Sequence, residues 1–154
     1  MTLGSIYLGY LLYNSVMFQA NTTVKMYDTD AAGILYFASQ FRFAHEAFEE
    51  LLQKEGYTFA DFIEREPFLF VIVHAECDYV ASLKVGDKID VNAWISKIGN
   101  TSFEFSYHFF RNMELVGKAK TNHVTLDRVG RKKMEIPDKI NVLLNKYADF
   151  SIEY

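Results

Sequence analysis

Residues 102–111 alternate aromatic and polar side chains, and no other feature of the sequence constrains the fold as strongly. The two sets are Phe103, Phe105, Tyr107 and Phe109 against Ser102, Glu104, Ser106 and His108. A period of two is typical of a β-strand that buries one face, because successive side chains point to opposite sides of a sheet. Four aromatic rings on one face carry a large apolar area, so this strand has to pack on a large apolar partner.

A single long amphipathic segment supplies that partner. Apolar residues recur at steps of three and four from Phe37 to Leu52, whereas polar residues such as Gln40 and Glu46 fall mostly between them. This spacing predicts a helix over about residues 37–54, which Gly56 ends as a C-cap residue. The sequence therefore predicts an α+β fold in which one strongly curved antiparallel sheet wraps around one long central helix.

Shorter signals complete the secondary structure. A strand over 18–27 ends in the turn-forming residues 28–33, and Thr58 can cap a short helix that runs to about residue 65. Pro67 then forbids further helix, and strands are predicted over 68–80, 88–98, 102–111 and 116–127. Their short connections favour an antiparallel meander, and a last helix over 138–146 follows Pro137.

Length, charge and cysteine content exclude several classes of protein. A chain of 154 residues is the size of one domain, and 16 basic against 20 acidic residues give a net charge of −4. That charge disfavours a nucleic-acid binder, which relies on attraction to phosphates. The one cysteine, Cys77, can form neither an internal disulfide nor a multi-thiolate zinc site, and it is compatible with a reducing cytoplasm.

We treat residues 1–17 as an uncharged N-terminal extension and 18–150 as the domain. No charge occurs between residues 1 and 24, and residues 6–13 are almost wholly apolar. The apolar run is far shorter than the ~20 residues that span a membrane, and no Lys or Arg precedes it, so neither an anchor nor a signal peptide fits well. Two interpretations stay open: a segment packed on a neighbouring surface, or translation from a start codon upstream of the native one, for which Met17 is an equally good candidate.

A recognisable motif, Tyr27-Asp-Thr-Asp-Ala-Ala-Gly-Ile-Leu-Tyr-Phe37, stands at the predicted start of the long helix. It resembles the Asp-x-Asp-x-x-Gly motif of the hotdog-fold acyl-CoA thioesterases of the 4-hydroxybenzoyl-CoA type. The resemblance covers about residues 18–144. Within that range, residues 45–49, 72–79, 85–87, 101–104 and 119–124 look most like the branch of the family that hydrolyses 1,4-dihydroxy-2-naphthoyl-CoA in quinone synthesis. The resemblance implies a hotdog fold and a cytoplasmic thioester hydrolase.

The resemblance also implies a catalytic site at this motif. Asp30 matches the family's catalytic carboxylate, which acts either as a nucleophile through an acyl-enzyme anhydride or as a general base on water, and the sequence leaves both routes open. The backbone N–H of Phe37 matches the donor to the thioester carbonyl, and Gly33 lets the chain pass close to the thioester. No cofactor is implied, because the coenzyme A thioester is the substrate.

Other acidic residues are expected to have lesser roles. Asp28 is interpreted as a turn residue that hydrogen-bonds its own backbone. A calcium loop does not fit, because Ala32 and Ser39 stand where an EF-hand needs oxygen ligands. A separate branch of these thioesterases resembles a different plan, in which a catalytic helix Glu is followed four residues later by Thr. Glu46 and Glu49 lack that Thr, so we expect them at most to line the pocket.

The histidines, aromatic residues and basic residues complete the set of candidates. The histidines form no metal-binding pattern and no metal is expected: His45, His74, His108 and His123. An aromatic acyl group would suit a pocket lined by aromatic side chains, for which the candidates are Tyr36, Phe48, Tyr57, Phe59 and Phe70. A basic cluster can hold the phosphates of coenzyme A, although a solvated basic turn explains it equally well: Arg128, Arg131, Lys132 and Lys133.

The predicted function is hydrolysis of an aromatic acyl-CoA, with 1,4-dihydroxy-2-naphthoyl-CoA as the first guess. The resemblance implies a homodimer, commonly paired into a homotetramer, with sites between subunits, and no nucleic-acid or membrane partner is expected. Two alternatives stay open. One is a broader acyl-CoA or acyl-carrier thioesterase, because the Asp motif is shared across substrates. The other is a non-catalytic acyl-binding domain of the same fold, which would not need the Asp30 carboxylate.

Overall fold

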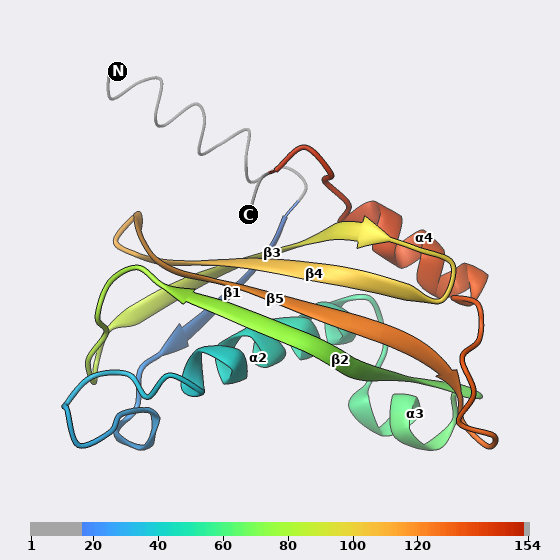
Figure 1. The fold of residues 1–154 in the computed structure, drawn as a ribbon, viewed down its shortest axis with the longest axis horizontal. Helices are drawn as coiled ribbons and strands as arrows, with labels where there is room; N and C mark the ends of the chain where they lie inside the picture. Colours follow the sequence, from blue (N-terminus) through green and yellow to red (C-terminus); the bar gives the residue numbers. More distant parts are fainter. Residues whose placement is uncertain (1–16, 153–154) are drawn as a thin grey trace.

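Five antiparallel strands form one sheet in the computed structural model, which describes residues 17–152 (Figure 1). The strands lie within a few residues of their predicted positions: β1 Phe18–Thr23, β2 Phe68–Tyr79, β3 Lys88–Ile98, β4 Ser102–Arg111 and β5 Glu114–Asp127. The predicted N-terminal extension lies outside the described residues, apart from Met17, which is buried.

The order of the strands in the sheet is β1-β3-β4-β5-β2. The predicted meander is therefore confirmed for β3, β4 and β5 but is wrong for β2, which pairs with β5. Both edges of β3 are taken, one by β1 and one by β4, so β2 pairs with the free edge of β5. Residues 80–87 are long enough to cross the roughly 14 Å of three strand spacings, so a short connection does not require neighbouring strands.

The long helix α2 runs from Ser39 to Lys54 beneath the sheet (Figure 1), two residues shorter at its start than predicted. Gly56 adopts a φ of +89° just after the helix, as a C-terminal glycine does. Thr58 caps the short helix α3, Phe59–Glu64, by accepting a hydrogen bond of 3.1 Å from the Asp61 N–H. The last helix, α4, spans Asp138–Lys146 after Pro137, as predicted.

The core lies between α2 and the sheet. All four alternating aromatic residues of β4 are buried, and the ring of Phe48 on α2 meets that of Phe105 edge-on with centroids 5.3 Å apart. Phe43 and Leu51 pack on the same face of the helix, so α2 is the partner that the aromatic strand required. No helix within residues 17–152 combines the length and the apolar character that crossing a membrane would need.

We expect Phe105→Ala to lower the free energy of unfolding by about 3–5 kcal/mol, because the ring is fully buried and its loss leaves a cavity that the core cannot close. Urea unfolding followed by circular dichroism measures the change. Phe150→Ala is the matched control, since that ring is 65% exposed and its removal should change stability by no more than about 0.5 kcal/mol. A loss of stability in the Phe105 variant as small as in the control would contradict the packing described.

Candidate active site

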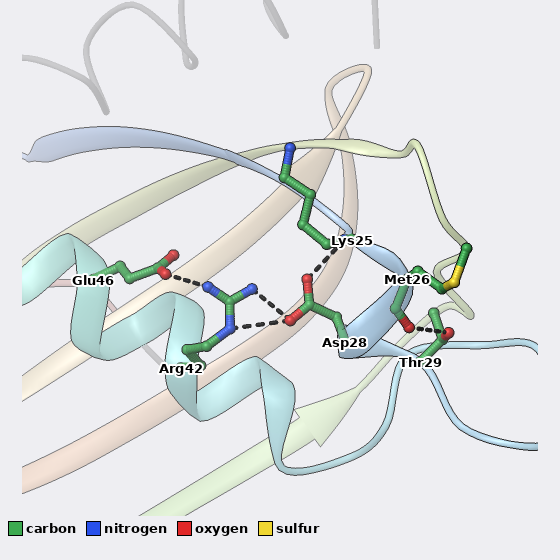
Figure 2. Close-up of polar contacts among 6 residues, drawn as sticks. All are labelled: Lys25, Met26, Asp28, Thr29, Arg42 and Glu46. Carbon is green, nitrogen blue, oxygen red and sulfur yellow. Dashed lines mark hydrogen bonds and ion pairs between the residues drawn. The ribbon is translucent and has the colours of Figure 1, made fainter.

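Asp28 ties the loop before α2 to the helix itself. Its carboxylate is buried, and Oδ2 accepts a hydrogen bond of 2.7 Å from the N–H of Lys25, the residue just before the short 3-10 helix η1, Met26–Asp28 (Figure 2). Oδ1 accepts from Nε and Nη2 of Arg42 at 3.0 and 2.5 Å, and Arg42 also pairs with Glu46. Burial lowers the pKa of Arg42, but the hydrogen bond to Asp28 and the two carboxylate charges raise it overall. Asp28 thus bonds its local backbone, as predicted, and also α2.

Asp30 is presented from a tight turn at the surface. One carboxylate oxygen, Oδ1, accepts a hydrogen bond of 2.8 Å from the Ala32 N–H. The turn is closed by bonds of 3.0 Å from the Gly33 N–H to the Asp30 carbonyl and of 3.1 Å from the Asp30 N–H to the Ile34 carbonyl. Gly33 has a φ of +75°, which explains a glycine here. No described residue bonds Oδ2, so this oxygen is available for chemistry.

Phe37 precedes the N-terminus of α2 with its backbone N–H unused. The residues before it are fixed by hydrogen bonds from the Leu35 N–H to the Leu83 carbonyl, 2.7 Å, and from the Tyr36 N–H to the Asp28 carbonyl, 2.8 Å. The Tyr79 hydroxyl donates a hydrogen bond of 2.8 Å to the Phe37 carbonyl. No acceptor within residues 17–152 takes the Phe37 N–H. This donor stands near the positive end of the helix dipole.

A cavity of about 360 Å³ brings Asp30 and Phe37 together with the end of β2. Gln40 also lines this cavity, although its side chain is buried. Its Nε2 donates to the backbone carbonyls of Asp78, at 3.1 Å, and Lys118, at 2.9 Å, which fastens the first turn of α2 to β2 and β5. Nothing in the local spacing of the helix marks Gln40 as more than a polar residue between apolar ones.

A second cavity, of about 480 Å³, lies between α2, α3 and β2. Three of the predicted acyl-pocket residues line it: Phe48, Phe59 and Phe70. The other two lie elsewhere. Tyr57 packs on Phe62 with ring centroids 5.6 Å apart, outside the lining, and Tyr36 is exposed beside Phe37. The aromatic cavity is therefore separate from the cavity that contains Asp30.

The two helix glutamates line neither cavity. Glu46 pairs with Arg42, and Glu49 lies 3.3 Å from Nε2 of His45, one turn before it on the helix. Within the described part of the chain, no group of three or more His, Cys, Asp or Glu side chains could hold a metal ion. Burial raises the pKa of the Cys77 thiol to about 11, so it is not a thiolate at neutral pH.

The predicted basic cluster divides into two parts. The guanidinium of Arg128 is committed to backbone carbonyls, at 2.5 Å from Glu66 and 3.0 Å from Phe68, and to that of Phe62. It therefore joins the end of α3 to the start of β2. The other three residues are exposed at the neighbouring turn: Arg131, Lys132 and Lys133. Arg131 also reaches the rim of the aromatic cavity.

Comparison with known proteins places the chain in a family. Residues 24–144 match the model of the thioesterase-like superfamily. A 1,4-dihydroxy-2-naphthoyl-CoA hydrolase from Nostoc punctiforme is 41% identical over 123 residues, which cover 80% of this chain and 83% of that protein.

Solved structures show the same fold. The crystal structure of a 1,4-dihydroxy-2-naphthoyl-CoA thioesterase from Synechocystis superposes with a TM-score of 0.78 at 29% identity, covering 84% of this chain and 96% of that one. A gentisyl-coenzyme A thioesterase superposes with a TM-score of 0.74 at 25% identity, covering 82% of this chain and 98% of that one.

The close contact between Gln40 and Gly117 generates a prediction. A Cβ at Gly117 would lie 2.5 Å from Oε1 of Gln40, so we expect Gly117→Ala to destabilise the fold by about 1–3 kcal/mol. Thermal and urea unfolding measure the effect. In a Gln40→Ala background the same substitution should be much less harmful, because the clashing amide is gone. Equal losses of stability in both backgrounds would contradict the contact.

Proposed function

The chain belongs to the thioesterase-like superfamily and is a thioester hydrolase, and we propose that its substrate is an aromatic acyl-CoA, with 1,4-dihydroxy-2-naphthoyl-CoA as the first candidate. The single observation that carries a catalytic role for this site is the shared cavity of Asp30 and Phe37, where a free carboxylate oxygen and an unused backbone N–H line the same space. Relatives from Nostoc punctiforme and Synechocystis are named for the proposed substrate.

The two groups match the two demands of thioester hydrolysis. Oδ2 of Asp30 attacks the carbonyl carbon and expels the coenzyme A thiolate, leaving a mixed anhydride that water hydrolyses, or it takes a proton from a water that attacks directly. The Phe37 N–H donates to the carbonyl oxygen as negative charge develops on it. A donor of this kind typically stabilises the transition state by about 2.7–4 kcal/mol.

Asp28 and Gln40 act as positioning residues for this chemistry. Asp28 holds the loop that carries Asp30 against α2 through Arg42, and Gln40 holds the first turn of α2 against the sheet. The carboxylate and the N–H are thereby kept in fixed relative positions before the substrate binds. Such preorganisation matters because a donor that had to move into place would lose much of its effect.

The phosphate groups of coenzyme A require basic side chains, and the enzyme has to work in a compartment that contains acyl-CoA. We assign phosphate binding to the exposed residues Arg131, Lys132 and Lys133, and a structural role to Arg128, whose guanidinium already serves three carbonyls. The lone cysteine and the coenzyme A substrate favour a cytoplasmic location.

We propose further that the enzyme is a dimer joined through β2. This strand is at the edge of the described sheet and exposes apolar side chains, among them Ile72, Val73 and Tyr79. Antiparallel pairing of two β2 strands about a twofold axis sets the Tyr79 end of one strand against the Phe68 end of the other. The Asp30 cavity of each subunit then adjoins the aromatic cavity of its partner.

We expect Asp30→Asn to reduce kcat by at least about 10²-fold, because the amide can neither attack nor accept the proton of water. Thiol release measures turnover of five acyl-CoA substrates: 1,4-dihydroxy-2-naphthoyl-CoA, gentisyl-CoA, 4-hydroxybenzoyl-CoA, and one short and one long aliphatic acyl-CoA.

Asp138→Asn, an exposed change on α4, is the control and should retain full activity. Turnover spread evenly over all five substrates would replace the aromatic assignment with a broad thioesterase. A folded Asp30→Asn variant with full turnover would contradict the mechanism.

Val73→Arg should dissociate the dimer and abolish turnover, since it places like charges near the proposed twofold axis at a side chain that is 62% exposed in the single chain. Sedimentation velocity measures the mass, and Val142→Arg on α4, 74% exposed, is the matched control. An active monomer would refute the shared site.

A further inference from the structure

The aromatic cavity is lined mostly by apolar side chains but also by a few polar ones. Its space of about 480 Å³ falls in the range of small-molecule sites. Most of its lining is aromatic or aliphatic, including Phe48, Phe59 and Phe70. Two of the few polar side chains in the lining are His45 and His123. A cavity of this kind suits a flat aromatic ring that carries a polar substituent.

His123 is a polar side chain almost fully enclosed by aromatic ones. It is 2% exposed, lies parallel to Phe103 with ring centroids 5.0 Å apart, and meets Phe48 at 4.9 Å. Its Nε2 lies 2.9 Å from the Thr121 hydroxyl, which lies 3.2 Å from the Tyr107 hydroxyl. Both partners are also buried. Burying a chain of polar groups in an aromatic core destabilises the fold unless hydrogen bonds offset the loss of their contacts with water.

The order of donors along this chain follows from Tyr107. Its hydroxyl is buried, and Thr121 is the one acceptor for its proton among the described residues. Tyr107 therefore donates to Thr121. Once Thr121 accepts from Tyr107, Nε2 of His123 is the one acceptor left among the described residues for the Thr121 hydroxyl proton, so Thr121 donates to Nε2. Burial, together with the nearby His45, lowers the pKa of His123 to about 3, so the ring is neutral at pH 7 and carries a single proton. That proton resides on Nδ1.

Nδ1 of His123 is thus a hydrogen-bond donor in the wall of the cavity, and no described residue accepts from it. We propose that the cavity holds the aromatic ring of the acyl group whose thioester lies at Asp30 of the partner subunit. This inference rests on the proposed function. His123 donates from Nδ1 to a hydroxyl on that ring. His123 is then the residue that selects hydroxylated aromatic acyl groups over plain ones.

His45 gives the ring a second polar neighbour at the rim of the cavity. Its ring lies 5.8 Å from that of Phe48 and 6.4 Å from that of Phe59, and Nε2 faces the Glu49 carboxylate at 3.3 Å. Glu49, which lines no cavity, thereby acts as a positioning residue for His45. An unhydroxylated ring would bury the His123 donor without an acceptor, and this mismatch is the source of discrimination.

Paired substrates that differ only in their hydroxyls test the assignment. We compare kcat/KM for 1,4-dihydroxy-2-naphthoyl-CoA and 2-naphthoyl-CoA in the wild-type protein, in His123→Phe and in Thr121→Val. The wild type should prefer the hydroxylated substrate by about tenfold or more, a ratio that corresponds to one hydrogen bond. His123→Phe should bring the ratio close to one, and Thr121→Val, which leaves the imidazole but removes the group that fixes its tautomer, should lower it.

His108→Phe is the matched control, because His108 is also buried but belongs to the polar set of β4, on the opposite face of the sheet. Its ratio should equal that of the wild type. An unchanged ratio in folded His123→Phe would overturn the assignment while leaving the Asp30 chemistry intact. The assignment of His123 would also be overturned if Asp30→Asn abolished turnover while substitution of His123 left the ratio of the two kcat/KM values unchanged.

Measuring the binding of the free acids tests the assignment of His123 even if no thioester is hydrolysed. Calorimetry measures the affinity of the wild-type protein and the variants for the free acids, 1,4-dihydroxy-2-naphthoate and 2-naphthoate, under anaerobic conditions. We expect tighter binding of the hydroxylated acid, lost in His123→Phe. If neither thioester were hydrolysed but this preference held, the proposed function would fail and the site would stand. Equal affinities for the two acids in the wild type would overturn the site.

Discussion

The aromatic face of β4 has to be covered, and the positions of the candidate site residues depend on how α2 covers it. Phe48 and its neighbours on α2 fill the concave side of the sheet, so the helix cannot slide or turn without exposing Phe105 and the rings beside it. The N-terminal end of α2 is thereby fixed beside the end of β2, where Asp30 and Phe37 share a cavity. The second half of α2 lines the aromatic cavity together with α3 and β2. One packed helix therefore sets the separation of the two cavities. A twofold axis through β2 would bring the Asp30 cavity of each subunit next to the aromatic cavity of its partner.

Buried polar side chains add precision to this arrangement. Asp28 binds the guanidinium of Arg42, and Gln40 binds carbonyls on two strands, so both ends of the segment that carries Asp30 and Phe37 are held. The chain of Tyr107, Thr121 and His123 fixes a tautomer in the wall of the aromatic cavity in a comparable way. Each of these groups would destabilise the core if it lost its partner. Their hydrogen bonds thus keep the loop, the helix start and the histidine in single positions.

Periodicity and turn residues were sufficient to predict the strands, the helices and the wrapping of the sheet, because these depend on local spacing and on one large apolar requirement. The resemblance of the Asp-x-Asp-x-x-Gly segment to its family also implied Asp30 and Phe37 as site residues, and the structure places them in one cavity. Features that depend on distant partners could not be predicted. The carbonyls that bind Gln40 are 38 and 78 residues away, and those that bind Arg128 are 60 to 66 residues away. The position of β2 at the edge beside β5 and the separation of the aromatic cavity from Asp30 likewise arise from tertiary pairing.

Complementation between two inactive variants tests the shared site most directly. Asp30→Asn removes the carboxylate, and Val71→Trp fills the aromatic cavity that Val71 helps to line. Each variant alone should be inactive. Co-expressed in equal amounts, half of the dimers are mixed, and each mixed dimer holds one site with both an intact carboxylate and an open cavity. The account therefore predicts that thiol release from 1,4-dihydroxy-2-naphthoyl-CoA recovers to about a quarter of the wild-type rate. A mixture of folded dimers that stays inactive would show that Asp30 and the aromatic cavity of one site belong to the same chain, and a Val71→Trp variant that is fully active alone would show that they share no site.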